Sequence, residues 1–177
     1  MKNVIYFDLE TQYLADEVGG WGNIPKMGLA AAVTYSTAHA SFSHYAEEDA
    51  GALVSELQSA DLVVGFNVVR FDYQVLQPYT EVPLQSLPTV DMLQHIQQAL
   101  GFRLSLDAIA VATLGTTKSA NGIQAVQWYR QGEMDKVFAY CQRDVEVTRD
   151  VHEFGVRNRH VRYRDRQYRI RQVPVRW

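Results

Sequence analysis

The sequence predicts a single α/β domain in which helices flank a mixed β-sheet. The chain opens with a short apolar run of β-branched and aromatic residues, followed by two further strand-like segments joined by a polar turn. A helical segment, a compact buried strand and several more helical segments come next. This order is typical of α/β folds, in which active sites gather at strand ends. The length of 177 residues suits one domain.

Local periodicity and breaker residues define the individual elements. The stretch 12–28 contains four glycines and Pro25, so a loop is expected there. The longest helical pattern covers residues 134–154, with apolar side chains at steps of three and four. Strands are expected at 4–7, 29–35, 40–45 and 62–66, helices at 47–58, 71–76, 92–100, 106–114, 123–130 and 134–154, and a polar loop at 115–121.

The end of the chain is strongly basic. From Arg157 onward there are eight arginines and one acid, Asp165, so residues 157–177 carry +7. The rest of the chain carries −10, and the whole protein −3. Apolar and charged residues alternate in 161–164 and 168–171, which predicts a C-terminal β-hairpin. Two interpretations stay open, a contact with the phosphates of a polyanion and a solvated pair of strands.

The composition argues against several classes of protein. The sequence has no apolar stretch near the ~20 residues that cross a bilayer, so no membrane partner is expected. The N-terminus reads as a strand and lacks the pattern of a signal peptide. The single cysteine, Cys141, excludes an internal disulfide and favours a reducing compartment. We therefore expect a cytoplasmic protein.

Two acids stand at the end of the first predicted strand. Asp8 and Glu10 are two residues apart, and alternate residues of an extended chain point to the same side. Like charges raise one another's pKa, so gathered carboxylates favour a divalent cation such as Mg²⁺. An Asp-x-Glu pair also occurs by chance at a sheet edge, where water or a helix N-terminus satisfies it.

Two further motifs carry acids later in the chain. Asn67 and Asp72 follow the buried strand that ends at Gly65, a residue that would let backbone approach a ligand closely. Asp72 alone is equally well explained as an acid in the first turn of a helix. Tyr140 and Asp144 are four residues apart on the longest helix and share a face. Such a pair suits a metal-binding carboxylate beside a phenol that orients water, although a surface pair with a packed ring is the simpler alternative.

Together the three motifs resemble the DEDD 3′–5′ exonuclease superfamily, which has the ribonuclease H-like fold. The spacing Tyr140-x-x-x-Asp144 is similar to its tyrosine (DEDDy) branch. The form Asn67-x-x-x-Phe71-Asp72 resembles the proofreading exonuclease of family B DNA polymerases and its stand-alone bacterial relatives. The resemblance runs from Phe7 to about Val151. It implies one exonuclease domain over 1–177, with 157–177 as a basic extension.

The resemblance also implies how the site would work. Asp8 would bridge two Mg²⁺ or Mn²⁺ ions, Glu10 and Asp144 would bind the ion that activates water, and Asp72 would hold the second ion. Tyr140 would orient the attacking water. The expected catalytic residues are Asp8, Glu10, Asp72, Tyr140 and Asp144, and all but Tyr140 are expected metal ligands. The expected substrate-binding residues are Leu9, Thr11, Asn67 and Phe71. Without the resemblance, Phe71 is most simply explained as a core residue.

The implied reaction removes 5′-mononucleotides from the 3′ end of single-stranded DNA or RNA. A polymerase, a helicase or a DNA repair complex would be a fitting partner. Two alternatives remain open: a nucleic-acid-binding module that keeps the fold, and a ribonuclease H-like endonuclease or resolvase.

Other residues have weaker signals. Asp91 precedes a helix with Gln94 three residues on, which favours a helix cap over a metal ligand. Trp21 and Tyr13 would stack on bases or pack within the domain. Lys118 and Arg103 would contact phosphates or, as is usual for single surface cations, have no specific role.

Overall fold

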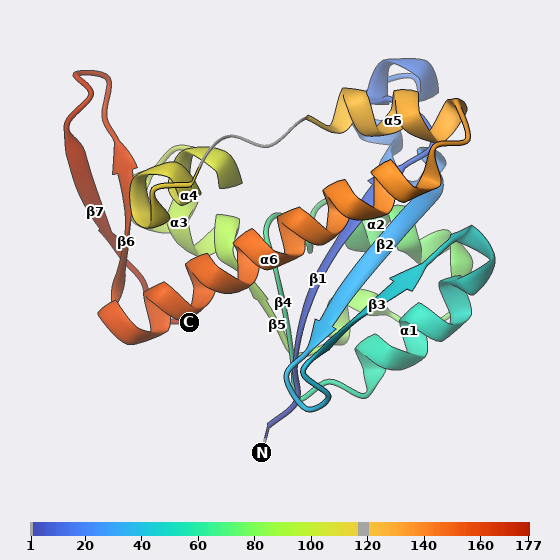
Figure 1. Ribbon diagram of the computed structural model, residues 1–177, viewed down its shortest axis with the longest axis horizontal. Coiled ribbons are helices and arrows are strands. Elements are labelled where there is room, and N and C mark those ends of the chain that lie inside the picture. Colours follow the sequence, from blue (N-terminus) through green and yellow to red (C-terminus); the bar gives the residue numbers. More distant parts are fainter. Residues whose placement is uncertain (1, 117–120) are drawn as a thin grey trace.

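A central five-stranded sheet organises the molecule, which is described by a computed structural model over residues 2–116 and 121–177 (Figure 1). The strands stand in the order β3-β2-β1-β4-β5. β1 pairs antiparallel with β2 and parallel with β4, which confirms the predicted mixed sheet. The strands are β1 (Val4–Thr11), β2 (Leu29–Ser36), β3 (Ser41–Tyr45), β4 (Leu62–Gly65) and β5 (Thr89–Asp91).

Helices cover both faces of this sheet, as the sequence predicts. One core cluster joins the sheet to α1 and α2, and a second joins the other face to α3, α4 and α6. The long helix α6 crosses its face of the sheet diagonally, and α5 packs over the first turns of α6 (Figure 1). The helices are α1 (Ala50–Gln58), α2 (Asp72–Leu76), α3 (Met92–Leu100), α4 (Leu106–Leu114), α5 (Gly122–Arg130) and α6 (Met134–Asn158).

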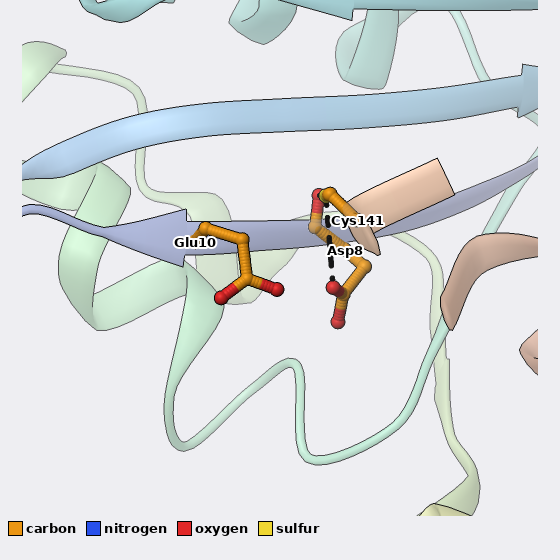
Figure 2. Close-up of side chains that lie close together, drawn as sticks. All are labelled: Asp8, Glu10 and Cys141. Atoms are coloured by element: carbon orange, nitrogen blue, oxygen red, sulfur yellow. Dashed lines mark hydrogen bonds between the residues drawn. The ribbon is translucent and has the colours of Figure 1, made fainter. Parts of the chain in front are cut away.

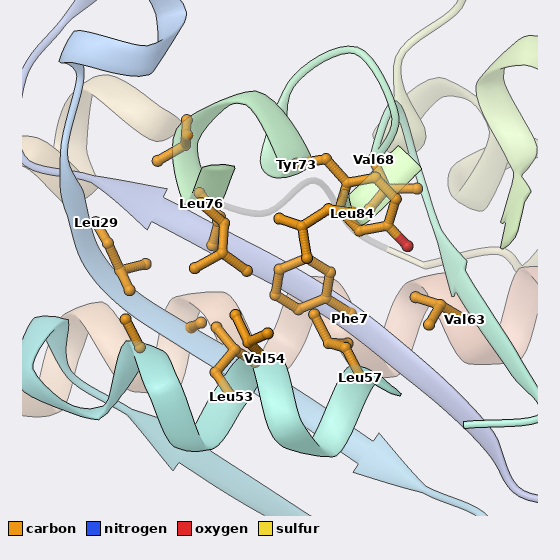
Figure 3. Packing of buried hydrophobic residues seen from close by; sticks show 14 of the residues in the cluster. Phe7, Leu29, Leu53, Val54, Leu57, Val63, Val68, Tyr73, Leu76 and Leu84 are labelled. Atoms are coloured by element: carbon orange, nitrogen blue, oxygen red, sulfur yellow. The ribbon is translucent and has the colours of Figure 1, made fainter. Parts of the chain in front are cut away.

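The alternation of side chains along β1 divides the two layers. Ile5, Phe7 and Leu9 are buried in the cluster with α1 and α2. Figure 3 shows Phe7 within this cluster. Tyr6 points the other way, into the cluster formed with α6. Because strand side chains alternate between faces, Asp8 and Glu10 continue the row of Tyr6 and face α6.

Several element bounds differ from the sequence expectation. β1 extends to Thr11, since strand pairing uses the backbone and tolerates the carboxylates that ended the apolar run. The expected loop 12–28 contains two 3₁₀ helices, η1 (Ala15–Val18) and η2 (Trp21–Lys26). Gly19, with a φ of 89°, ends η1 in the left-handed conformation, so a glycine there closes a short helix rather than marking open loop. Further 3₁₀ turns are η3 (Glu47–Asp49), η4 (Gln77–Tyr79) and η5 (Leu84–Ser86).

The predicted C-terminal hairpin is confirmed as a separate two-stranded sheet. β6 (His160–Arg164) pairs antiparallel with β7 (Ile170–Pro174) beside α4 (Figure 1). The second strand starts two residues later than expected, because Tyr168 takes a left-handed φ of 61° and belongs to the turn. The chain then returns to α6, where Trp177 Nε1 donates to the His152 carbonyl at 3.1 Å.

Lys118, weighed from the sequence as a phosphate contact or an unspecific surface cation, lies outside the described residues. Within residues 2–116 and 121–177, every helix is too short or too polar to traverse a bilayer.

Candidate active site

Asp8 and Glu10 lie side by side on β1, on the face that α6 covers (Figure 2). Glu10 is buried at 8% exposure and Asp8 is half-buried. A carboxylate oxygen from each and the Cys141 sulfur lie within 4.8 Å of one another. The Cys141 thiol donates to the Asp8 carbonyl at 3.3 Å and to Asp8 Oδ2 at 3.7 Å. Helix α6 is therefore packed directly onto this acidic pair.

Asp72 reaches the same point from the other layer. It begins α2, just beyond the end of β4, and is 3% exposed. Its Oδ1 accepts a hydrogen bond from the Leu9 amide at 3.1 Å. β1 and β4 are parallel, so their carboxyl ends meet at one edge of the sheet, and this bond fixes Asp72 there. Burial raises the pKa of Asp72 to about 8, against the effect of its backbone hydrogen bonds.

Tyr140 and Asp144 lie one turn apart on the same face of α6. Burial raises the pKa of Tyr140 well above its usual range, with Asp144, Glu10 and Asp8 adding to the effect in that order. The phenol is therefore a stable donor. The Trp128 ring of α5 meets the Tyr140 ring edge to face at 6.3 Å and supports its orientation.

The four acids form one electrostatic site. Burial raises the pKa of Asp8 well above its usual range, and the carboxylates of Asp72, Asp144 and Glu10 raise it further. Burial likewise raises the pKa of Glu10, together with Asp144 and Asp72. Like charges reach this strength of coupling only at close range. The sequence placed these residues in three distant motifs, and the fold brings them together from β1, α2 and α6.

This cluster fits a divalent cation. Without a counter-ion, the carboxylates crowd one another and favour protonation, whereas a hard cation would keep them ionised and draws on oxygen ligands. The nearby Cys141 thiol has a pKa raised well above its usual range by burial and by Asp8. It therefore stays protonated beside the acids and acts as a hydrogen-bond donor.

Asp91 organises the approach to the site. Its carboxylate accepts from the amides of Leu93 and Gln94, so the predicted cap of α3 is confirmed. The same carboxylate also accepts from the amides of Asn67 at 2.9 Å and Val69 at 3.1 Å. This second role was not predicted, because it depends on the parallel pairing of β4 with β5. It holds the loop that carries Asn67 in its left-handed conformation, with a φ of 68°.

Gly65 has a different role from the expected approach to a ligand. A Cβ atom there would lie 2.7 Å from Val68 Cβ and 3.2 Å from the Phe7 carbonyl oxygen. The glycine is needed because the chain turns back on itself after β4, with Val68 buried against β1.

Two adjoining clefts border the acids. The first, here called the terminal cleft, has a volume of about 390 Å³ and includes Glu10 and Thr11 in its wall. The second, the arginine cleft, has a volume of about 330 Å³ and includes Asn67, Arg70 and Arg103. Trp21 and Phe71 line both clefts, with ring centroids 6.3 Å apart. Leu14, Ala15, Asp16, Met27, Gly122 and Ile123 complete the terminal cleft, and Ile24 completes the arginine cleft.

The expected substrate-binding residues differ in their burial and in their contacts. Thr11 is buried, and its hydroxyl donates to the Tyr13 carbonyl at 2.9 Å. Leu9 is 3% exposed and lies in the core, so only its backbone borders the site. Asn67 Oδ1 accepts from the Arg103 guanidinium at 3.1 Å, which ties Arg103 to the site. Phe71 is half-buried and packs on the core with one side while lining both clefts with the other.

Two residues at the site were missed as site residues from the sequence. Cys141 had a signal, since it is three residues before Asp144 and shares its helical face. Trp128 had none, because its contact with Tyr140 depends on how α5 folds back over α6.

Comparison with known proteins agrees with this architecture. Among curated protein sequences, none matches the chain significantly. The structure of the family B DNA polymerase from the hyperthermophilic archaeon Pyrobaculum calidifontis shares the fold, with a TM-score of 0.67 and 15% identity over 88% of this chain. The present chain spans 25% of the length of that polymerase. The RNase_H superfamily model matches residues 5–154, and the chain therefore belongs to the RNase H superfamily and has a nuclease-type fold.

Proposed function

We propose that the protein is a metal-dependent 3′–5′ exonuclease that degrades single-stranded DNA or RNA to 5′-mononucleotides. The observation that carries this proposal is the convergence of Asp8, Glu10, Asp72 and Asp144, from three elements, beside the phenol of Tyr140. The carboxylates of Asp72, Asp144 and Glu10 raise the pKa of Asp8, and those of Asp144 and Asp72 raise the pKa of Glu10, which is typical of acids gathered at a functional site.

The four carboxylates would hold two Mg²⁺ or Mn²⁺ ions. Asp8 is the best candidate for the shared ligand, since the carboxylates of Asp72, Asp144 and Glu10 all act on it. When bound, such ions lower the pKa of water, polarise the phosphoryl group and stabilise the leaving oxygen. The chain itself contributes the Tyr140 hydroxyl, which would orient the attacking water toward the phosphorus.

The clefts support action on the end of a single strand. The terminal cleft, at about 390 Å³, has room for one nucleotide and adjoins Glu10 directly. Leu14 and Ile123 of α5 add apolar surface to its wall. Trp21 is 67% exposed and, with Phe71, offers aromatic surface on which an unpaired base can stack. The motif Asn67-x-x-x-Phe71-Asp72, similar to polymerase proofreading domains, supports the 3′ end as the one cleaved.

The test is cleavage of a 5′-labelled oligonucleotide of DNA and of RNA, with Mg²⁺ or Mn²⁺. We expect a ladder that shortens from the 3′ end and disappears with a chelator. Asp8→Asn, which keeps the shape but removes a ligand charge, should lower the rate by about 10³-fold or more. Asp135→Asn, an exposed acid in the first turn of the same α6, is the matched control and should cleave normally.

Each alternative has its own signature in this assay. Linearisation of a circular single strand would indicate an endonuclease or resolvase instead. Binding that survives the chelator, without cleavage of DNA or RNA under either metal, would indicate a binding module and reject the proposal.

Tyr140→Phe separates the role of the hydroxyl from that of the ring. The ring would keep its contact with Trp128, while the hydroxyl that would orient the water is lost. We expect kcat to fall by about 10–100-fold with KM nearly unchanged, because the hydroxyl acts on the water and not on the bound strand. Normal turnover in this variant would remove Tyr140 from the catalytic set.

A further inference from the structure

Three clefts that share lining residues lie between the active site and the basic hairpin. A third groove, here called the hairpin groove, has a volume of about 590 Å³ and runs between the segment before α4 and the turn of β6–β7. Arg103 lines both this groove and the arginine cleft, just as Trp21 and Phe71 line both the arginine cleft and the terminal cleft. Phe102, Leu104, Tyr163, Arg164, Asp165, Arg166 and Gln167 complete the hairpin groove.

The groove has the chemistry of a polyanion site. Arg103, Arg164 and Arg166 are all exposed within it. Its one acid, Asp165, is already engaged by the guanidinium groups of Arg169 at 3.0 Å and Arg171 at 2.9 Å. The surplus of positive charge in the groove is therefore available to a ligand, while the rest of the chain is acidic.

Aromatic side chains in the groove favour an unpaired strand over a duplex. Phe102 is 46% exposed, and its ring meets Tyr163 edge to face at 6.0 Å. Cations that follow a backbone, interleaved with rings that accept bases, are the combination by which proteins hold single strands without sequence preference. A duplex presents phosphates but no free base faces, so it would leave these rings unused.

We propose that the hairpin groove binds the single-stranded segment upstream of the nucleotide being removed. The strand would leave the terminal cleft past Trp21 and Phe71, follow Arg70 and Arg103, and enter the groove beside Arg164 and Arg166. This proposal rests on the exonuclease function above, because it assigns the path of that substrate. It predicts that long strands bind better than short ones at the same active site.

The experiment measures binding and cleavage separately. Fluorescence anisotropy with 5′-labelled oligothymidylates of 2, 6 and 12 nucleotides, in a chelator, reports affinity without turnover. Arg164→Ala with Arg166→Ala removes two charges from the groove. The matched control, Arg157→Ala with Arg176→Ala, removes two charges of the same segment from outside it, on exposed residues.

We expect the groove variant to bind the 12-mer about 10-fold more weakly and the control variant less than about 2-fold more weakly. The slope of log affinity against log salt should become shallower by about 1.4 in the groove variant, at about 0.7 for each lost phosphate contact on a single strand. Phe102→Ala should weaken 12-mer binding about 5-fold or more through lost stacking. Cleavage of the dinucleotide should be equal in the wild type and both double variants.

The possible failures are distinct. If the groove and control variants weaken binding of the 12-mer equally, the arginines of the segment attract the strand only through their overall charge. That result would overturn the proposed path. The path is equally overturned if the wild type binds 2-mer and 12-mer alike while cleaving both, an outcome that leaves the exonuclease function standing. Tighter binding of a 12-base-pair duplex than of the 12-mer would reject a single strand as the occupant. Groove-dependent binding without any cleavage would support the groove and reject the exonuclease.

Discussion

The acidic site and the basic tail are both rich in charge, yet they differ in what surrounds the charges. The carboxylates of Glu10 and Asp72 are buried, and burial together with their neighbours raises their pKa. The arginines Arg164, Arg166 and Arg176 are exposed to solvent. An exposed charge in water adds little to the free energy of folding, whereas like charges gathered in a protein interior oppose folding.

The difference indicates what each region needs from its ligand. The acidic site, under the proposed function, suits a compact cation of high charge, because such an ion interacts with several close carboxylates at once. The tail has no such demand and suits an extended polyanion whose binding depends on salt. In one region the ligand is expected to stabilise the fold, and in the other it is expected to leave the fold almost unchanged.

The two regions are also held in place by different parts of the structure. The acids stand on β1, α2 and α6, where the hydrophobic core fixes them. The tail is held by Val161, Val173 and Trp177, which pack against the helices, whereas Arg164, Arg166 and Arg176 are exposed. Three predictions test this contrast.

The largest effect is expected from neutralising a buried acid. With a folded pKa of about 8 and an unfolded value near 3.8, Asp72 holds a proton in the folded state that the unfolded state releases. The metal-free protein should therefore lose stability as the pH rises from about 4 to 8. Asp72→Asn mimics the protonated acid and can still accept from the Leu9 amide. At pH 8 it should raise the free energy of unfolding by roughly 5 kcal/mol, and below pH 4 by almost nothing.

Urea denaturation in a chelator, at several pH values, measures this difference. His152 has its pKa lowered to about 4 by burial, so it costs stability as the pH falls below its ordinary value. That contribution is common to both proteins and cancels between them. A gap between variant and wild type that stays constant with pH would show that Asp72 is ionised in the metal-free fold. The contrast with the tail would then fail.

A smaller effect is expected where the tail is anchored by packing. A Cβ atom on Gly155 would lie 2.6–2.8 Å from three atoms of the Trp177 ring. Gly155→Ala should displace Trp177 from α6 and cost roughly 2 kcal/mol, with little dependence on salt. Gly51→Ala is the control, because Gly51 lies in α1 with nothing within 4 Å of an added Cβ. It should stabilise the protein by about 0.5–1 kcal/mol. A destabilisation by Gly155→Ala that disappears in high salt would mean that charge, and not packing, holds the tail.

The same contrast explains how much the sequence could predict. The period-two and period-3.6 patterns located the strands and helices, since those patterns record which side chains are buried. Asp8 and Glu10 were expected on one side of the strand because that depends only on alternation. The 3₁₀ helices η1 and η2 were missed, since their stretch has few core contacts to impose a period.

Contacts between distant segments were the harder part. The second role of Asp91, at the Asn67 loop, needs β4 and β5 to be parallel neighbours, which a helix-cap pattern does not reveal. The connection through Arg103 needs both the arginine cleft and the hairpin groove to exist. A lone surface arginine in a sequence carries no sign of either, so only the assembled fold links the tail with the acids.

The smallest effect is expected from removing exposed arginines. Arg166→Ala or Arg176→Ala should change the free energy of unfolding by less than about 0.5 kcal/mol, because each guanidinium is solvated in both the folded and unfolded states. Arg169 and Arg171 are unsuitable for this test, since both hold Asp165 in the hairpin turn. Urea denaturation at 0.05 and 0.5 M salt measures the change. If either variant lowers the free energy of unfolding by more than about 1 kcal/mol, the charge of the tail contributes to the stability of the fold. A near-zero change, beside the gain from Asp72→Asn, would show that the buried carboxylate of Asp72, and not these exposed arginines, carries an electrostatic cost of folding.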